Sequence, residues 1–178
     1  NTNNEAYASW NWKANGSGSN NTDGTIDTVV SANVDAGFSI VGWTGTGAAA
    51  KTIGHGLSKA PEMVIVKQRG SSVALYSWQV YHSGLSGNAN SLALNNNHDA
   101  TGDTNTFNNT APTSSVFSLS NDAYKNITNH SSTTYISYHF HSVEGYSKLG
   151  SYTGIASADS NFINLGFRPA YLLIKCAG

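Results

Sequence analysis

Hydrophobic side chains occur along this chain in short runs, and each run is interrupted by Gly, Asn, Ser or Pro. The runs are rich in β-branched and aromatic residues, which favour strands, and they are too short to show the periodicity of a helix. We predict strands at residues 6–12, 25–30, 38–43, 62–68, 74–81, 91–94, 116–119, 133–143, 146–152 and 171–176. About ten strands at this spacing are typical of an all-β sandwich or barrel, and we favour an antiparallel β-sandwich of the jelly-roll or lectin-like kind.

The predicted strands differ in how they should be buried. Residues 133–143 alternate, with Thr134, Ile136, Tyr138 and Phe140 on one face and Tyr135, Ser137, His139 and His141 on the other. Such alternation is expected where one face of a sheet meets the core. Residues 63–66 and 172–174 are apolar at every position, so we expect these two strands to be central and covered on both faces.

The chain also repeats part of its own sequence. Residues 37–42 (GFSIVG) are echoed by residues 145–150 (GYSKLG), and residues 60–67 (APEMVIVK) by residues 168–175 (RPAYLLIK), both at an offset of 108 positions. Residues 7–12 (YASWNW) resemble residues 135–140 (YISYHF) at an offset of 128 positions. Two matched blocks in one order predict a repeated structural unit of about 108 residues.

This repeat divides the chain into three parts. We interpret residues 1–36 as the closing strand of a preceding unit and a Gly/Ser/Asn-rich linker, residues 37–144 as one complete β-sandwich unit, and residues 145–178 as the opening strands of a further unit. The chain therefore resembles a segment of a longer protein. If the interpretation holds, residues 6–12 should be equivalent to residues 134–140, and residues 146–175 should mirror residues 38–67.

Composition narrows the classes of partner. Only 11% of the residues are charged and the net charge is −1, so there is no cationic stripe of the kind that nucleic-acid binding requires. No apolar run approaches the length of a membrane helix, so we expect no membrane insertion. The single cysteine, Cys176, lies in an apolar run, where a buried small hydrophobic residue is the simplest interpretation.

Several phrases of the sequence together resemble a known family. They are GFSIV (37–41), WTG (43–45), GHGL (54–57), APEMVIVK (60–67), VYH (80–82), GYSKLGSYTG (145–154) and GFRP (166–169). This set resembles a repeated β domain of phage virion structural and tail-fibre-like proteins of the marine and cyanobacterial type. The resemblance implies a virion surface location, with copies of the same chain or other virion proteins as partners. It carries no catalytic residue to this chain.

The resemblance and the composition together lead to a non-enzymatic expectation. We expect a virion surface or fibre structural protein that assembles with copies of itself and presents loops for attachment to a host surface. The alternatives are a lectin-like carbohydrate-binding adhesin, located extracellularly or on a cell surface, and a polysaccharide depolymerase. A depolymerase needs paired carboxylates, yet Glu5, Glu62 and Glu144 show no recognisable pairing, and no GxSxG motif is present.

Two groups of residues could bind a metal. His139 and His141 would lie on one strand face near Glu144, but we interpret that face as a solvated polar surface. Asp99, Asp103 and Asn105 supply oxygen ligands in a Gly-containing loop and are weak calcium candidates, although their spacing matches no established calcium loop and Asn and Asp are also common turn formers. We therefore predict no metal site and no cofactor.

Aromatic residues beside amides are the remaining signal of a ligand site. Trp78, Tyr81 and His82 precede an Asn-rich stretch and could offer a stacking surface with amide groups nearby, which suits a host-surface glycan. A core position for Trp78 is the competing interpretation. We expect Trp10, Trp12 and Trp43 in the core, because the repeat aligns them with Tyr138, Phe140 and Tyr152.

Overall fold

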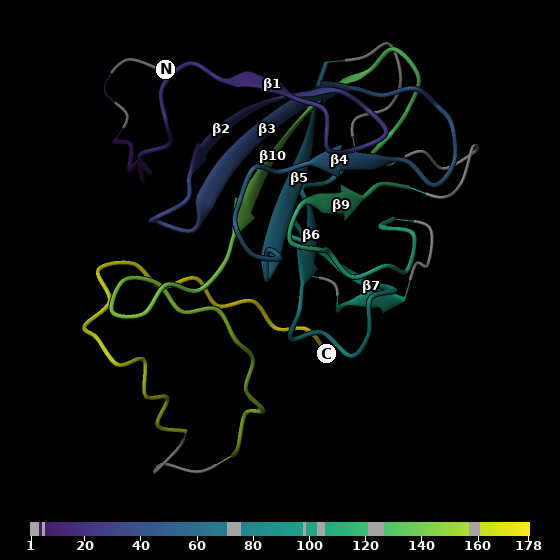
Figure 1. Ribbon diagram of the computed structural model, residues 1–178. Helices are drawn as coiled ribbons and strands as arrows, with labels where there is room; N and C mark the ends of the chain where they lie inside the picture. The colour runs from purple at the N-terminus through teal and green to yellow at the C-terminus, as the bar shows by residue number, and fades with distance from the viewer. Residues whose placement is uncertain are drawn as a thin grey trace.

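The computed structural model of the chain describes residues 4, 6–70, 76–97, 99–102, 106–120, 127–156 and 161–178, and this part is all-β with no helix (Figure 1). No helix that could cross a membrane is therefore found among the described residues. The strands are β1 (Ser19–Asn21), β2 (Thr28–Asn33), β3 (Phe38–Thr44), β4 (Thr52–Gly54), β5 (Met63–Gly70), β6 (Gln79–His82), β7 (Asn90–Ala93), β8 (Thr101–Gly102), β9 (Val116–Ser118) and β10 (Thr134–Phe140). The predicted all-β class is confirmed.

The strands form one large sheet and one small sheet. The large sheet has eight strands in the order β1-β2-β3-β10-β5-β6-β7-β8, and β4 pairs with β9 in the small sheet. All of these strand pairs are antiparallel. The last strand, β10, lies in the middle of the large sheet, where Tyr138 is opposite Ile40 of β3 and Ile65 of β5.

The small sheet lies over one face of the large sheet, as Figure 1 shows for β4 and β9. We call the covered face the core face. Its hydrophobic core includes Val41 and Trp43 of β3, Val64 and Val66 of β5, Tyr81 of β6 and Tyr135 of β10, which pack with Ile53, Phe107, Phe117 and Leu119 from the covering layer. Trp43 stacks on Tyr135 with ring centroids 5.2 Å apart. Hydrophobic burial on this face is the main force that holds the two layers together.

The core face includes side chains that we expected to be solvated. Tyr135, Ser137 and His139 are 0–1% exposed and His141 is 5% exposed, so the predicted solvated polar face of β10 was wrong. The alternation in the sequence identifies two faces, but it does not say which face another layer covers. Here the covering layer packs on the more polar face of β10. Some polar groups of that face bond to one another, as in the 2.7 Å contact between Ser137 Oγ and His139 Nε2.

The opposite face of the large sheet, which we call the second face, is only partly covered. Ile40, Ile65, Tyr138 and Phe140 are half-buried there. The ring of Trp12 lies over its edge, with centroids 6.4 Å from Phe38 and 6.1 Å from Phe140. Tyr171 of the C-terminal segment contacts Trp12 in turn, at 5.5 Å. The two terminal segments therefore meet beside the second face.

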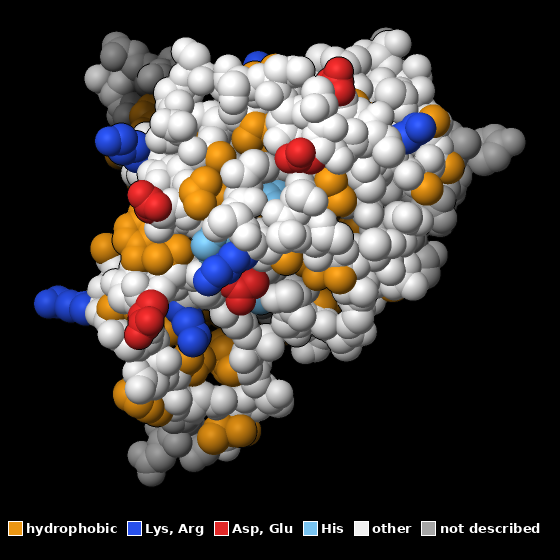
Figure 2. Space-filling model, in the orientation of Figure 1, with side chains coloured by type: hydrophobic (Ala, Val, Ile, Leu, Met, Phe, Trp, Pro, Cys, Tyr) orange, Lys and Arg blue, Asp and Glu red, His pale blue; other side chains and the backbone are white. Residues whose placement is uncertain are grey.

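The terminal segments differ from the prediction. Residues 6–12, 146–152 and 171–176 are not strands in this structure, and Trp10, Trp12 and Cys176 are exposed. Leu172 and Ile174, which we expected to be covered, are 66% and 60% exposed. The lower extension of the molecule in Figure 1 accordingly shows hydrophobic side chains on its surface in Figure 2, below a group of charged side chains where it joins the rest of the molecule. β-propensity alone did not form these strands, because a strand needs a neighbour to pair with.

Two glycine pairs in the repeated phrases share a positive φ angle. Gly37 and Gly145, 108 positions apart, have φ angles of 62° and 72°. Gly56 and Gly166, each followed by a large apolar residue and then by a proline, have φ angles of 68° and 80°. Positive φ is a conformation that glycine adopts without steric cost. The turns themselves differ, because the N–H of Gly37 donates to the carbonyl of Val34, whereas at the second site the N–H of Tyr146, one residue after Gly145, donates to the carbonyl of Val143.

Candidate functional site

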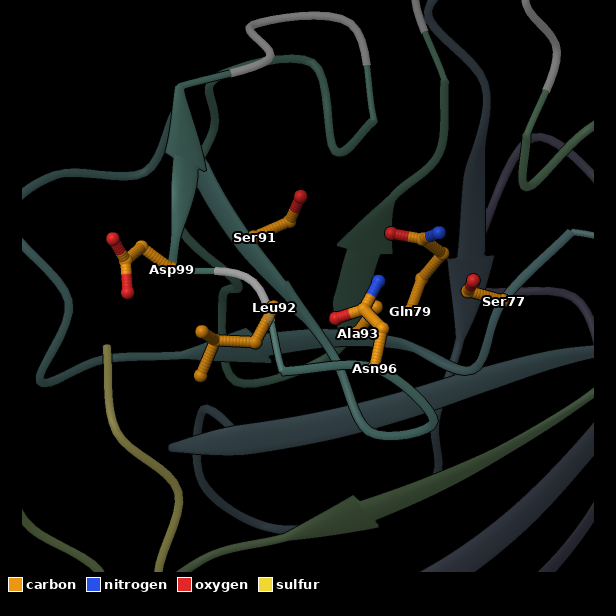
Figure 3. Close-up of a pocket in the computed structure, with 7 residues that line it drawn as sticks. All are labelled: Ser77, Gln79, Ser91, Leu92, Ala93, Asn96 and Asp99. Atoms are coloured by element: carbon orange, nitrogen blue, oxygen red, sulfur yellow. The ribbon is translucent and has the colours of Figure 1, made fainter. Parts of the chain in front are cut away.

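A small polar hollow lies where β6, β7 and the loop after β7 meet (Figure 3). It has a volume of about 160 Å³ and is lined by Ser77, Gln79, Ser91, Leu92, Ala93, Asn96 and Asp99. Figure 3 shows the amides of Gln79 and Asn96 close together and the carboxylate of Asp99 on the other side of the hollow. Two amides, two hydroxyls and a carboxylate provide both hydrogen-bond donors and acceptors, which is the chemistry that recognises a polyhydroxylated ligand.

Trp78 is 37% exposed but does not line the hollow: its ring lies with Lys67 on the second face, whereas the next residue, Gln79, lines the hollow on the other side of the strand. Its backbone N–H donates to Asn95 Oδ1 at 2.9 Å, and its C=O accepts from the N–H of Leu94 at 3.1 Å, so the loop after β7 fixes its position. The ammonium of Lys67 lies 5.9 Å from the ring centroid and is itself held by a 2.6 Å bond to the carbonyl of Tyr76. Trp78 is therefore a fixed, partly exposed aromatic surface and not the core residue of the competing interpretation.

The other two residues of the predicted ligand surface do not join Trp78. Tyr81 is 4% exposed and belongs to the core face, where its ring meets Phe107 and Phe117 at centroid distances of 6.2 and 5.9 Å. His82 is half-buried and pairs with Met63 on the second face. Successive side chains of a strand point to opposite faces, so Tyr81 and His82 cannot form one platform. Trp78 and His82 lie on the second face and Tyr81 lies on the core face, so the structure does not bring the three residues together, and a ligand site at Trp78 stays a prediction.

The weak calcium candidates are only partly described. Asp99 lines the hollow, whereas Asp103 and Asn105 lie outside the described residues. Among the residues that the structure describes, no group of three or more His, Cys, Asp or Glu side chains could hold a metal ion. Glu62, one of the carboxylates considered for catalysis, accepts a hydrogen bond from the backbone N–H of Ser142. It therefore ties the end of β10 to the start of β5.

A second cluster of polar side chains is buried between the two layers. His55 follows β4, and its ring stacks on that of His139 with centroids 5.6 Å apart. His55 Nδ1 accepts the N–H of Leu57 at 3.2 Å, and Nε2 lies 3.2 Å from the carbonyl of Thr113, so Nε2 carries the proton and the ring is neutral. His139 Nδ1 and Ser39 Oγ are buried without a hydrogen-bond partner among the described residues.

Burial controls the protonation of this cluster. It lowers the pKa of His139 well below its ordinary value, and the neighbouring His55 lowers it further. It also lowers the pKa of His55, which the Thr113 carbonyl and Asp23 partly offset and His141 reinforces. The contact between Ser137 and His139 resembles a nucleophile–base pair, but both residues are fully buried beneath Phe117 and His55, so no substrate reaches them. The cluster is a structural element that is sensitive to pH.

Sequence reasoning missed most residues of the hollow. Gln79 and Ser91 lie on paired strands and are brought together only by the register, in which Gln79 is opposite Ala93. The loop of Asn95, Asn96 and Asp99 could be recognised in the sequence as a candidate polar surface, because it is rich in amides directly after a short apolar run. We expected that loop to form one surface with Trp78, whereas the hollow combines the loop with Ser77 and Gln79, which flank Trp78 in the sequence and face the other side of the strand. The buried histidines could not have been found this way, since an HxH pattern on a strand is equally compatible with an exposed face.

The chain was compared with known families, curated proteins and solved structures. Neither the curated proteins nor the solved structures gave a match. The family described as "Domain of unknown function (DUF7483)" matches the chain over residues 1–178. This match covers the whole sequence, and the chain therefore belongs to the DUF7483 family.

Proposed function

We propose that the chain is a non-enzymatic structural module of a virion surface or fibre protein that assembles with copies of itself. The observation that supports this proposal is the exposed apolar surface of residues 145–178, where Ile155, Phe162 and Leu172 are 55%, 92% and 66% exposed. Large apolar patches on a protein surface mark sites of association. The virion location rests on the resemblance of the repeated phrases to phage structural proteins.

The internal repeat is part of this proposal. Residues 37–144 would be one complete sandwich unit, closed by β10, while residues 1–36 and 145–178 would belong to neighbouring units. The repeated sequence blocks and the shared positive φ of Gly37 and Gly145 support this interpretation. The two-layer arrangement of the large sheet and the β4–β9 sheet supports the sandwich architecture. Repeats of this kind suit an elongated assembly, because each unit contacts mainly its neighbours.

The assembly proposal predicts concentration-dependent multimers. Light scattering over a range of protein concentrations should show a mass that rises above that of the monomer, and electron microscopy should show ordered chains or lattices. The double substitution Leu172→Lys and Ile174→Lys should shift the protein to monomers, because it places two charges on the exposed apolar segment. The matched control is Val29→Lys, at a side chain 55% exposed on β2, which should leave the multimers unchanged. A strictly monomeric wild type would contradict the proposal.

A second candidate function is carbohydrate binding, and two separate features favour it: the polar hollow and the partly exposed ring of Trp78. The amides, hydroxyls and carboxylate of the hollow suit the hydroxyl edges of a sugar, and the Trp78 ring, on the other side of the strand, offers a separate stacking surface for an apolar sugar face. The site would serve attachment to a host-surface glycan, with the structural sheet as its support. A small shallow hollow of this size accommodates one sugar unit of a longer chain.

Carbohydrate binding predicts a specific loss on substitution of Trp78. On a glycan array, wild type should bind a limited set of glycans, and Trp78→Ala should weaken that binding by about tenfold, which corresponds to ~1.4 kcal/mol of lost stacking and burial. The matched control is Tyr152→Ala, at an aromatic residue that is 50% exposed on the C-terminal extension, and it should bind as wild type does. Equal binding by wild type and Trp78→Ala would exclude the Trp78 ring as the glycan site.

A further inference from the structure

Three segments outside the complete unit repeat the pattern of its three central strands. Residues 146–152 correspond to β3, residues 171–177 to β5 at an offset of 108, and residues 6–12 to β10 at an offset of 128. In the large sheet β10 lies between β3 and β5 and runs antiparallel to both. The terminal segments therefore carry the two outer strands and the central strand of one further three-stranded sheet.

The strand register of the large sheet predicts which side chains should be neighbours in that further sheet. Phe140 is opposite Met63, so the corresponding residues Trp12 and Tyr171 should be neighbours. In the structure their rings are in contact, with centroids 5.5 Å apart at an interplanar angle of 87°. Trp10, the counterpart of Tyr138, is 5.7 Å from the Tyr171 ring, as expected for the diagonal neighbour two residues along. The side chains of the two segments are thus complementary in the predicted register.

The counterparts of the most deeply buried strand residues are exposed. Val64 and Val66 of β5 are 0% and 2% exposed, whereas their counterparts Leu172 and Ile174 are 66% and 60% exposed. The sequence preserves large apolar residues at positions that require burial, and this structure of one chain does not bury them. A strand inserted beside residues 171–177 would bond its backbone and extend the apolar face on which Leu172 and Ile174 lie, as β10 extends the face of Val64 and Val66.

The N-terminal segment of the same chain does not complete this sheet. The carbonyl of Lys13 accepts from Asn33 Nδ2 at 3.1 Å, and the N–H of Asn15 donates to Ser31 Oγ at 2.9 Å, so residues 13–15 are held along β2. Trp12 is held against Phe38 and Phe140 of the same sheet. With the segment tethered in this way, residues 6–12, 146–152 and 171–177 remain outside any strand, although Trp12 touches Tyr171.

We propose that residues 6–12 of a second copy insert between residues 146–152 and 171–177 of the first and take the position that β10 takes between β3 and β5. This inference rests on the proposed self-assembly and specifies its partner and its contact. Trp12 and Trp10 of the incoming strand face Tyr171 and Leu173. Each copy offers one central strand and accepts another, so the contact is head-to-tail and generates filaments or closed rings.

Disulfide trapping tests the proposed pairing. Cys176 is first replaced by Ser, since it is exposed and would react. In that background Trp10→Cys and Leu173→Cys are made in separate proteins, because the counterpart pair Tyr138 and Ile65 is directly opposite in the large sheet. Directly opposite strand residues are close enough for a disulfide. On mixing and oxidation, the two variants should shift from monomer to a mixed dimer on a non-reducing gel. The matched control, Val29→Cys mixed with Leu173→Cys, should remain monomeric.

The doubly substituted chain distinguishes the possible outcomes. With Trp10→Cys and Leu173→Cys in one chain, the proposal expects a ladder of cross-linked multimers, whereas a disulfide closed within a monomer would overturn it. Absence of the mixed dimer would also overturn it. Light scattering on the same Cys176→Ser background distinguishes failure of this contact from failure of self-assembly. Multimers that form without the cross-link would contradict only the proposed strand contact. Monomers alone would contradict both the contact and the proposed self-assembly.

Discussion

Replacing Phe117 by alanine is expected to lower the free energy of unfolding by about 3–5 kcal/mol, the usual cost of deleting a fully buried phenylalanine ring. Phe117 is 0% exposed and lies on β9, in the layer that covers the core face. Its ring centroid is 5.2 Å from that of Phe107, 5.9 Å from Tyr81 and 5.7 Å from His139. Removing the ring leaves a cavity at the junction of both layers, and urea unfolding followed by tryptophan fluorescence measures the loss.

Two further variants calibrate this result. Phe117→Leu keeps most of the volume and should cost less than the alanine variant, because the cavity is smaller. Val29→Ala, at a side chain that is 55% exposed on β2, should change stability by less than about 0.5 kcal/mol. A loss below about 1 kcal/mol for Phe117→Ala would contradict the packing of β4 and β9 on the large sheet.

Stability is expected to fall steeply as the pH drops below about 6.5, the ordinary pKa of histidine in an unfolded chain. Burial lowers the pKa of His139 and of His55 in the folded state. Below pH 6.5 these histidines therefore become protonated in the unfolded state while they stay neutral in the folded state. The free energy of unfolding decreases as the pH falls for this reason. The decrease continues until the folded-state pKa values are passed. A difference of one bound proton between the unfolded and folded states changes the free energy of unfolding by about 1.4 kcal/mol per pH unit, and a difference of two protons changes it by roughly twice that.

Replacing one of the two histidines should remove its contribution to the pH dependence of the free energy of unfolding. His139→Gln keeps a polar group beside Ser137 but cannot be protonated in this range, so its unfolding free energy between pH 6.5 and 5 should change less steeply by about 1.4 kcal/mol per pH unit. Val80→Ala, at a buried residue of the second face, is the control: it should lower stability at every pH and leave the slope unchanged. Urea unfolding at a series of pH values measures both. A wild-type stability independent of pH over this range would contradict the buried, neutral state of the histidines.

The sequence allowed the fold class and most of the central strands to be predicted. The predicted strands at residues 38–43, 62–68, 91–94 and 116–119 closely match β3, β5, β7 and β9, because β-branched and aromatic residues coincide there with flanking turn formers. Short strands such as β1 and β4 were missed. Residues 19–21 are Ser-Asn-Asn, which have weak strand propensity, and residues 52–54 are Thr-Ile-Gly, where two favourable residues before a glycine are too short a run to be recognised; both pair because tertiary contacts bring a partner alongside.

The candidate site was less accessible to prediction than the fold. The partial exposure of Trp78 agrees with a surface position, but Tyr81 was assigned to the same surface although strand alternation directs it into the core. The choice between core and solvent for His139 depended on the covering layer, because His55, which follows β4, and Phe117 of β9 contact its ring only in the folded chain. Local pattern determines which residues share a face, whereas long-range packing determines what covers that face.

The central place of β10 has a consequence for synthesis on the ribosome. Because β3 and β5 pair with β10 and not with each other, a nascent chain that has reached β9 carries two open strand edges in the middle of its future sheet. Such edges can pair with strands of other chains, and non-local pairing of this kind makes folding slow. Productive folding therefore waits for the release of residues 134–140 from the exit tunnel, and translation that stops before them should yield aggregated chains.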